Sequence, residues 1–199
     1  MGEENAKCEG VRVLVACEES QSVTKAFRAK GHEAYSCDLQ ECSGGHPEWH
    51  YKGNVIHQLY NDWDLVIGHP PCTRLANSGV RWLAERDLWE EMYSACEFFN
   101  HFQSLGKRGV KVCIENPIPH KYAVEYIGKY DQIIQPWQFG HPESKATCLW
   151  LYNLPKLKPT DIVEGREQRI WKLPPGPNRT KERSKTFHGI ANAMADQWG

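Results

Sequence analysis

The stretch DLVIGHPPC, residues 64–72, decides the fold of this chain. Its first five residues form a short apolar run bounded by turn formers, which predicts a buried strand over residues 64–68. The two prolines that follow can neither continue a β-ladder nor enter a helix interior. The chain therefore leaves the sheet there and carries Cys72 on the next bend. Because open α/β sheets bind ligands at the carboxyl ends of their strands, the sequence puts a thiol where a ligand is expected.

Similar apolar runs on both sides of this stretch predict a parallel sheet. A strand over residues 11–16, a helix over 21–30 with Ser20 as its N-cap, and a strand over 32–37 form the opening of a βαβ unit. The other expected strands are 110–114, 132–135 and 146–152, and the other expected helices are 84–105, 119–127 and 190–198. The predicted fold class is α/β, a mostly parallel, doubly wound sheet with helices on both faces, in a single domain over residues 1–199.

The composition fits a globular domain without a strong electrostatic field. The 199 residues are 40% hydrophobic and carry a formal net charge of −1, with a pI near 6.7. Binding to nucleic acid would therefore depend on local basic patches rather than on the whole-molecule charge. No apolar run approaches the ~18 residues of a membrane span, and the amino terminus lacks the basic-then-apolar pattern of a signal peptide. We expect a cytoplasmic protein with no membrane contact.

The eight cysteines are scattered along the chain and are expected to stay reduced, several as small buried hydrophobes. Cys37, Cys42, His46 and His50 have spacings that a zinc site could use. The same segment contains Ser43-Gly44-Gly45 and Pro47, which are typical of an ordinary loop. We assign no metal and keep zinc as the alternative.

Chemically active residues follow several of the predicted strands. The turn Cys17-Glu18-Glu19-Ser20 follows the predicted strand 11–16, and Asp38 follows the strand 32–37. Cys72 follows the strand 64–68, and Glu115-Asn116 follows the strand 110–114. A carboxylate is costly in a core, so Glu115 is expected to point into the crevice at the end of its strand. Parallel strands bring these residues to one edge of the sheet. A nucleophile and an acid beside a residue able to hold a ribose suggest a nucleoside-containing cofactor and covalent chemistry.

These residues resemble the catalytic core of the cytosine-C5 DNA methyltransferases. Pro70-Pro71-Cys72, followed by Asn77-Ser78-Gly79, resembles the family's nucleophile loop, and Glu115-Asn116 resembles its Glu-Asn motif. Asp38 takes the place of the family's ribose-binding acid. Gly53-Asn54-Val55 takes the place of its Gly-Asp-Ile adenine contact. The resemblance covers about residues 11–152 and 187–198, including Ala191-Asn192-Ala193, which is similar to a Gly-Asn-Ala motif.

The resemblance implies a Rossmann-like methyltransferase fold, S-adenosylmethionine as cofactor, and DNA or a cytosine nucleotide as substrate. Cys72 would attack C6 of the cytosine ring, and Glu115 would hydrogen-bond N3 and the exocyclic amine. A base inside a duplex would first have to be flipped out. The implied cofactor-binding residues are Cys17, Glu18, Glu19, Asp38, Asn54 and Asn192, and the implied substrate-binding residues are Pro71, Asn77, Ser78, Asn116 and Lys145.

The chain also departs from the family pattern. The first turn is Cys17-Glu18-Glu19-Ser20 instead of a glycine-rich turn, although its carboxylates could attract the ammonium and sulfonium charges of the cofactor. The usual Gln-Arg-Arg run is missing, and Lys145 in Ser144–Thr147 is the nearest basic residue. No large target-recognition domain precedes the last helix. In these respects the chain resembles small methyltransferase-like proteins of bacteriophages, which would place it in a bacterial or phage-infected cell.

Residues 155–186, here called the basic arm, differ in composition from the rest. The arm has five prolines and nine Lys or Arg against four Asp or Glu. It is either a solvated linker or a phosphate-contacting segment. Among the eight tryptophans, one or two could stack on a base, but packing in the core or in a lid explains them equally. The tryptophans are residues 49, 63, 82, 89, 137, 150, 171 and 198.

Three hypotheses follow. The first is an S-adenosylmethionine-dependent cytosine-C5 methyltransferase acting on DNA or a free cytosine nucleotide. The second is a protein of the same fold that binds a nucleotide or a protein partner without transferring a methyl group, motivated by the altered first turn and the missing recognition domain. The third is a different covalent modification of a pyrimidine by Cys72. A homo-oligomer is open under each of them.

Overall fold

The computed structural model describes residues 10–170, 172–176 and 179–199. Its centre is a seven-stranded sheet in the order β3-β2-β1-β4-β5-β7-β6. The strands β3, β2, β1, β4 and β5 pair in parallel, whereas β7 is antiparallel to both β5 and β6. The predicted mostly parallel α/β sheet is confirmed. The strands are β1 Arg12–Ala16, β2 Glu33–Asp38, β3 His50–Lys52, β4 Leu65–Gly68, β5 Lys111–Asn116, β6 Gln132–Ile134 and β7 Thr147–Tyr152.

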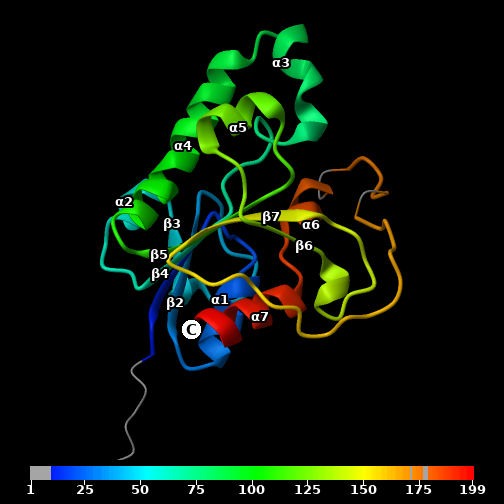
Figure 1. Ribbon diagram of the computed structural model, residues 1–199. Coiled ribbons are helices and arrows are strands. Elements are labelled where there is room, and N and C mark those ends of the chain that lie inside the picture. The colour runs from blue at the N-terminus through cyan, green and yellow to red at the C-terminus, as the bar shows by residue number, and fades with distance from the viewer. Residues whose placement is uncertain (1–9, 171, 177–178) are drawn as a thin grey trace, which may run out of the picture.

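Helices cover both faces of this sheet, as the doubly wound prediction required. Figure 1 shows α1 and α7 together on one side and α2, α4 and α5 on the other. The helices are α1 Ser22–Ala29, α2 Ile56–Leu59, α3 Arg81–Glu85, α4 Trp89–Lys107, α5 Lys121–Ile127, α6 Arg179–Ser184 and α7 His188–Trp198. None of the described helices is long and apolar enough to cross a bilayer.

The two helical layers follow from alternation along the strands. In β1, Val13 and Val15 belong to the core under α1 and α7, which includes Phe27. The intervening Leu14 belongs to the opposite core, which includes Phe99 of α4. From Val13 to Ala16 both faces of β1 are fully buried, and only Arg12 at its start is exposed. A strand that is apolar on both faces is stable only with a layer on each side, and residues 13–16 have that character.

Two element boundaries differ from the sequence expectation. The helix expected over residues 84–105 is two helices, α3 and α4, separated by a break at which Asp87 has φ 49°. The strand expected to end at residue 114 continues through Glu115 and Asn116, which pair with Leu149 and Cys148 of β7. The antiparallel ladder to β7 satisfies the backbone there, and this non-local pairing overrides the local preference for ending the strand.

The basic arm packs against the domain over part of its length. Leu157 is buried in the core next to α7, and its backbone exchanges two hydrogen bonds with the side chain of Gln132, 2.7 and 2.8 Å long. Further along, isolated β-bridges join Phe139 to Asp161 and Glu143 to Glu167. The arm is therefore attached to the sheet before it reaches α6, a helix that the sequence did not predict.

A close approach between β4 and α4 gives a stability prediction. A Cβ at Gly68 would lie 2.7 Å from the ring atoms Cδ1 and Cε1 of Phe102, whose side chain is fully buried and cannot move aside. We expect Gly68→Ala to lower the free energy of unfolding by about 1–3 kcal/mol, measured by urea denaturation. The control is Gly176→Ala, where no described atom lies within 4 Å of the added Cβ, and a change within about 0.5 kcal/mol is expected. Equal stabilities of the two variants would contradict this packing.

Candidate active site

A cavity of about 520 Å³ opens at the carboxyl ends of β1, β2 and β4. It lies where the chain connections reverse direction, between β1 and β4, which is the position at which doubly wound sheets bind ligands. Of the predicted cofactor-binding residues, Cys17, Asp38 and Asn54 line it, and so does Pro71, which was expected to contact the substrate. The remaining lining residues are Leu39, Gln40, Gly53, Val55 and Phe98.

The donor set and shape of this cavity suit a nucleoside. Asp38 presents a carboxylate at the end of β2, where it can accept hydrogen bonds from ribose hydroxyls. Leu39, Val55 and Phe98 supply apolar surface for a purine ring. Leu39 is 74% exposed because nothing in the described chain covers it. These residues fit the nucleoside portion of S-adenosylmethionine. Val55 belongs to the Gly53-Asn54-Val55 segment expected at the adenine, whereas the sequence missed Leu39 and Phe98 because they belong to separate elements and form no motif.

Glu18 has a structural role that the sequence did not predict. Its carboxylate accepts hydrogen bonds from the backbone N–H of Val23 at 2.6 Å, from that of Thr24 at 3.2 Å, and from the Thr24 hydroxyl at 2.7 Å. Burial raises the pKa of Glu18, whereas the charge of His69 and these bonds lower it. Glu18 thus satisfies the first N–H groups of α1, the role expected of Ser20. The residue at the N-cap position is Gln21, without a side-chain cap bond.

The rest of the first turn is also tightly held. Cys17 has φ 60°, and its backbone N–H donates to the carbonyl of Cys37 at 2.7 Å. Burial, followed by the charge of Asp38, raises the pKa of the Cys17 thiol to about 12. Glu19 is buried, and within the described chain its carboxylate oxygens accept no hydrogen bond. Lys181 of α6 lies 3.4 Å from Glu19, so the basic arm supplies the counter-charge. Neither Glu18 nor Glu19 lines the nucleoside-sized cavity.

The loop after β4 is fastened to the end of β5. The Nδ1 atom of His69 lies 2.7 Å from Oε2 of Glu115, and the two side chains are only 12% and 11% exposed. The side-chain amide of Asn116 donates to the carbonyl of Pro70 at 2.8 Å. The carbonyl of Cys72 accepts from the N–H groups of the residues three and four positions later, which forms the expected bend. Asn116 is buried and holds the loop, which differs from its expected contact with substrate.

Cys72 is half-buried and lies within electrostatic reach of Glu115. Burial and then the charge of Glu115 raise the pKa of the thiol, while the charges of Lys145 and Arg183 lower it. The thiol is therefore protonated at neutral pH in the free protein. Two cations from the segment before β7 and from α6 are available to stabilise a thiolate or a neighbouring anion.

Glu115 lines a second, very small cavity together with Lys145. Its volume is about 10 Å³, close to the minimum for one water molecule. Thr186 and Phe187, at the end of the basic arm, close it, and Lys145 Nζ donates to the carbonyl of Lys185 at 3.3 Å. A nucleobase can reach Glu115 through this cavity only if these arm residues move.

Seven predicted site residues line neither cavity: Glu18, Glu19, Cys72, Asn77, Ser78, Asn116 and Asn192. Asn77 and Ser78 are exposed in the short 3-10 helix Asn77–Gly79, and Asn192 lies on the exposed side of α7. His69 is the residue of the site that the sequence analysis missed. Its signal is its position: it directly follows a buried strand at the same edge as the other site residues.

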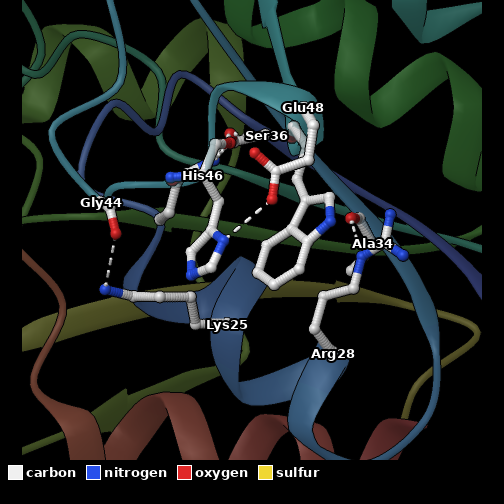
Figure 2. Close-up of polar contacts among 9 residues, drawn as sticks. Lys25, Arg28, Ala34, Ser36, Gly44, His46 and Glu48 are labelled. Carbon is white, nitrogen blue, oxygen red and sulfur yellow. Dashed lines mark hydrogen bonds and ion pairs between the residues drawn. The ribbon is translucent and has the colours of Figure 1, made fainter.

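Three of the four residues considered for zinc, Cys37, His46 and His50, make other contacts, and Figure 2 shows the bond between His46 and Glu48. His46 bonds Glu48 at 3.0 Å and stacks on Trp49, and the thiol of Cys37 is directed to the carbonyl of Gly53 at 3.7 Å. Both ring nitrogens of His50 have oxygen partners, the Ser36 hydroxyl and the Gln40 carbonyl. Within residues 10–170, 172–176 and 179–199, no three His, Cys, Asp or Glu side chains are grouped to hold a metal ion.

The tryptophans are mainly packing residues. Trp63, Trp150 and Trp198 are buried, and Trp82 lies between the guanidinium groups of Arg81 and Arg86, each 4.2 Å from its ring. Trp171 is outside the described residues.

The comparisons with known proteins gave structural matches only. No protein-family model matches the sequence, and no curated protein matches it as a relative. Among solved structures, the chain is similar to the methyltransferase EhMeth of Entamoeba histolytica, with 17% identity, a TM-score of 0.46, and 80% of this chain and 57% of that chain covered. For the Dnmt2 methyltransferase of S. pombe the values are 14%, 0.42, 81% and 53%. For a DNMT2 variant of Spodoptera frugiperda they are 12%, 0.39, 80% and 55%. The chain spans a little over half the length of these three proteins.

The charge of Glu115 beside Cys72 predicts how the thiol reacts. Alkylation by iodoacetamide follows the thiolate, so the rate at Cys72 should rise with pH through a midpoint above that of an ordinary thiol. Glu115→Gln removes the negative charge and should speed alkylation at pH values below that midpoint by a factor of about 2–10. Mass spectrometry of the Cys72 peptide measures the rate. Glu125→Gln, an exposed change on α5, is the control, and equal rates in both variants would show that Glu115 does not act on Cys72.

Proposed function

We propose that this protein is an S-adenosylmethionine-dependent cytosine-C5 methyltransferase that acts on DNA or on a free cytosine nucleotide. One observation carries the proposal. The loop that carries Cys72 follows β4, Glu115 lies near the end of the adjacent parallel strand β5 and its charge acts on the Cys72 thiol, and Pro71, next to Cys72, lines a cavity of about 520 Å³. The motifs around these residues resemble those of cytosine-C5 methyltransferases.

Cys72 would be the nucleophile. C5 of cytosine is too weakly nucleophilic to take a methyl group until an electron-rich group adds to C6. In the proposed step the Cys72 thiolate would form a bond to C6, and the C5–C6 π pair would form the new bond from C5 to the electrophilic methyl group. When C5 then loses its proton, the electron pair of the broken C5–H bond would restore the C5–C6 double bond, and the C6–S bond would break to release the thiolate. Because the free thiol is protonated, it must lose its proton on substrate binding, and the cations Lys145 and Arg183 favour this loss.

Glu115 would bind the ring. Its ionised carboxylate would accept a hydrogen bond from the exocyclic amine and so orient the ring for attack at C6. The pKa of Glu115 supports an ionised group: burial raises it, but the bond to His69 and the charges of His69 and Lys145 lower it below the usual range.

The 520 Å³ cavity would hold the cofactor, whose chemical contribution is an electrophilic methyl group. Asp38 would accept from the ribose, and Leu39, Val55 and Phe98 would contact the adenine. Pro71 lines this cavity one residue before Cys72, so the cofactor site and the nucleophile are connected through the same loop.

The basic arm would contribute phosphate contacts. Arg183 of α6 and Lys145 both act on the charge of Cys72, so they lie close to the nucleophile. No target-recognition domain lies between β7 and α7, and the arm occupies that position in the chain. These cations would bind the phosphate of the target nucleotide or of its neighbours.

One observation favours the second hypothesis, a nucleotide-binding protein without methyl transfer. Glu18 occupies the N–H groups at the start of α1, in the turn that resembles the glycine-rich turn of the methyltransferases. A carboxylate there leaves no free N–H groups of Val23 and Thr24 for an anionic group of a ligand. A protein of this kind would keep the nucleoside cavity and lose affinity for the methionine portion.

Trapping with 5-fluorocytosine tests the first proposal. Fluorine cannot leave C5 as a proton does, so the thiolate is not expelled and a covalent adduct should accumulate in the presence of S-adenosylmethionine. We expect an adduct with a 5-fluorocytosine oligonucleotide or with 5-fluorocytidine nucleotides, detected by intact-protein mass spectrometry. Cys72→Ser should form none.

The matched control is Cys42→Ser, a half-buried thiol outside both cavities, which should form the adduct at the wild-type level. The absence of an adduct with every substrate would reject the methyltransferase proposal. If calorimetry then showed nucleotide binding without affinity for S-adenosylmethionine, the second hypothesis would stand.

The salt dependence of DNA binding tests the arm. Each cation that contacts a phosphate should add roughly 0.7–0.9 to the slope of log K against log salt. We therefore expect the double variant Arg183→Gln and Lys185→Gln to lower the slope by about 1–2, measured by fluorescence anisotropy with an oligonucleotide. Lys129→Gln, in the exposed turn after α5, is the control and should leave the slope unchanged. A slope unaffected by the double variant would make the arm a linker.

A further inference from the structure

The bond between His69 and Glu115 occupies one oxygen of the carboxylate on which the proposed function depends. Nδ1 of His69 lies 2.7 Å from Oε2, and both side chains are nearly nine-tenths buried. Among the described residues, no donor lies within hydrogen-bonding distance of the other oxygen, Oε1. The carboxylate therefore reaches a ligand with a single free oxygen.

The surroundings of His69 fix which nitrogen carries the hydrogen. Nε2 is buried and has no hydrogen-bond partner in the described chain. A hydrogen on Nε2 alone would bury an unsatisfied N–H and would face the Glu115 carboxylate with the bare Nδ1 atom. Both the neutral and the protonated imidazole consequently carry hydrogen on Nδ1 and donate it to Glu115. The bond lasts for as long as Glu115 is ionised.

Hydrogen bonds on two sides fix the backbone at His69 and so restrict the position of its imidazole. The backbone N–H of His69 donates to the carbonyl of Ala16 at the end of β1, at 2.9 Å. The next carbonyl, that of Pro70, accepts the side-chain amide of Asn116 at 2.8 Å. The two prolines stiffen the chain immediately afterwards. His69 is thus built into the frame that joins the ends of β1, β4 and β5.

We infer that His69 is the positioning residue of the site: it holds Oε2 of Glu115, keeps the carboxylate ionised, and leaves Oε1 as its one free acceptor. This inference rests on the proposed function and narrows it. A single carboxylate oxygen accepts hydrogen bonds and cannot donate them, so it pairs with an exocyclic amine. Uracil and thymine carry a carbonyl oxygen at that ring position, which repels Oε1, and their N3–H donor gains no bond as long as His69 holds Oε1 opposite that position rather than opposite N3. The site should therefore select cytosine over uracil or thymine rings through the His69–Glu115 pair.

The charges around the pair agree with this role. The charged groups that act on His69 are Glu115 of β5, Glu18 of the first turn and Lys145 before β7. Burial lowers the pKa of His69, but the bond to Glu115 and the charges of Glu115 and Glu18 raise it overall. The buried thiols of Cys113 and Cys148 are also near Glu115. They are neutral and therefore do not offset the negative charge of Glu115.

Loss of the imidazole should therefore change the titration of Glu115. Burial is the first influence on Glu115, and it raises the pKa of the carboxyl when His69 no longer opposes it. His69→Leu removes both the hydrogen bond and the charge. His69→Gln keeps an N–H donor of similar reach without a charge. The sign is fixed: in His69→Leu the carboxyl takes up its proton at higher pH than in the wild type.

Carbon-13 NMR of glutamate carboxyls in the free protein is the first measurement, with the Glu115 signal assigned by its loss in Glu115→Gln. We expect the Glu115 titration midpoint to rise in His69→Leu and to rise less in His69→Gln. In Glu115→Gln, the ring signals of His69 should titrate at lower pH than in the wild type. This variant keeps the test valid if His69→Leu does not fold. A Glu115 titration unchanged in His69→Leu and Gln, or a His69 titration unchanged in Glu115→Gln, would overturn the inference.

The second measurement is the rate of adduct formation with 5-fluorocytosine and 5-fluorouracil nucleotides as a function of pH. For the cytosine analogue, His69→Leu should lose roughly 10- to 100-fold in rate, the effect of one charged hydrogen bond, and its acid limb should move to higher pH. His69→Gln should recover most of the rate, and cytosine-to-uracil selectivity should fall only in His69→Leu. If His69→Leu kept the selectivity and the pH profile of the wild type, the inference would be contradicted. If the wild-type protein itself formed no adduct, the proposed function would fail instead.

Discussion

The burial of one carboxylate at the end of a central strand is the constraint on which the site depends. Glu115 is only 11% exposed, and an ionised group so placed needs a charged or hydrogen-bonding partner. His69 supplies that partner from the neighbouring strand end, and Asn116 bonds the carbonyl of Pro70 next to it. The loop that carries Cys72 is therefore bound to the end of β5 at two adjacent residues. The same contacts hold the Glu115 carboxylate and the start of the loop that leads to Cys72.

The first turn of this chain differs in its hydrogen bonds from the glycine-rich turn of the family that the sequence resembles. A glycine-rich turn exposes backbone N–H groups, whereas here Glu18 accepts hydrogen bonds from those at the start of α1. Glu19 is turned toward the basic arm, where Lys181 balances its charge. Of this turn only Cys17 lines the 520 Å³ cavity, and the other lining residues, which include Asp38 and apolar side chains, come from other segments.

The basic arm connects the substrate side to the rest of the molecule. In its first part, Leu157 is hydrogen-bonded to Gln132 of β6. In its last part, Lys181 pairs with Glu19, and the carbonyl of Lys185 accepts a hydrogen bond from Lys145. Thr186 and Phe187 then close the small cavity at Glu115. Phe187 also packs against the core that includes α1 and α7, and its ring contacts His141.

The sequence by itself determined the sheet and the edge at which its chemistry gathers. Runs such as 11–16 and 64–68 are apolar at nearly every position. Both faces of such a strand are buried in a parallel sheet that has helices on each side. Cys72, Asp38 and Glu115 were therefore expected to follow strands whose carboxyl ends lie at the same edge of the sheet. Tertiary structure alone decided which of these residues touch. The His69–Glu115 bond joins residues 46 positions apart, and the contact between Lys181 and Glu19 joins the arm to the first turn. Pairings of this kind depend on the register of strands and on side-chain rotamers, which local composition does not specify. For the same reason the capping role of Glu18, the extension of β5 and the division between α3 and α4 emerged only from the folded chain.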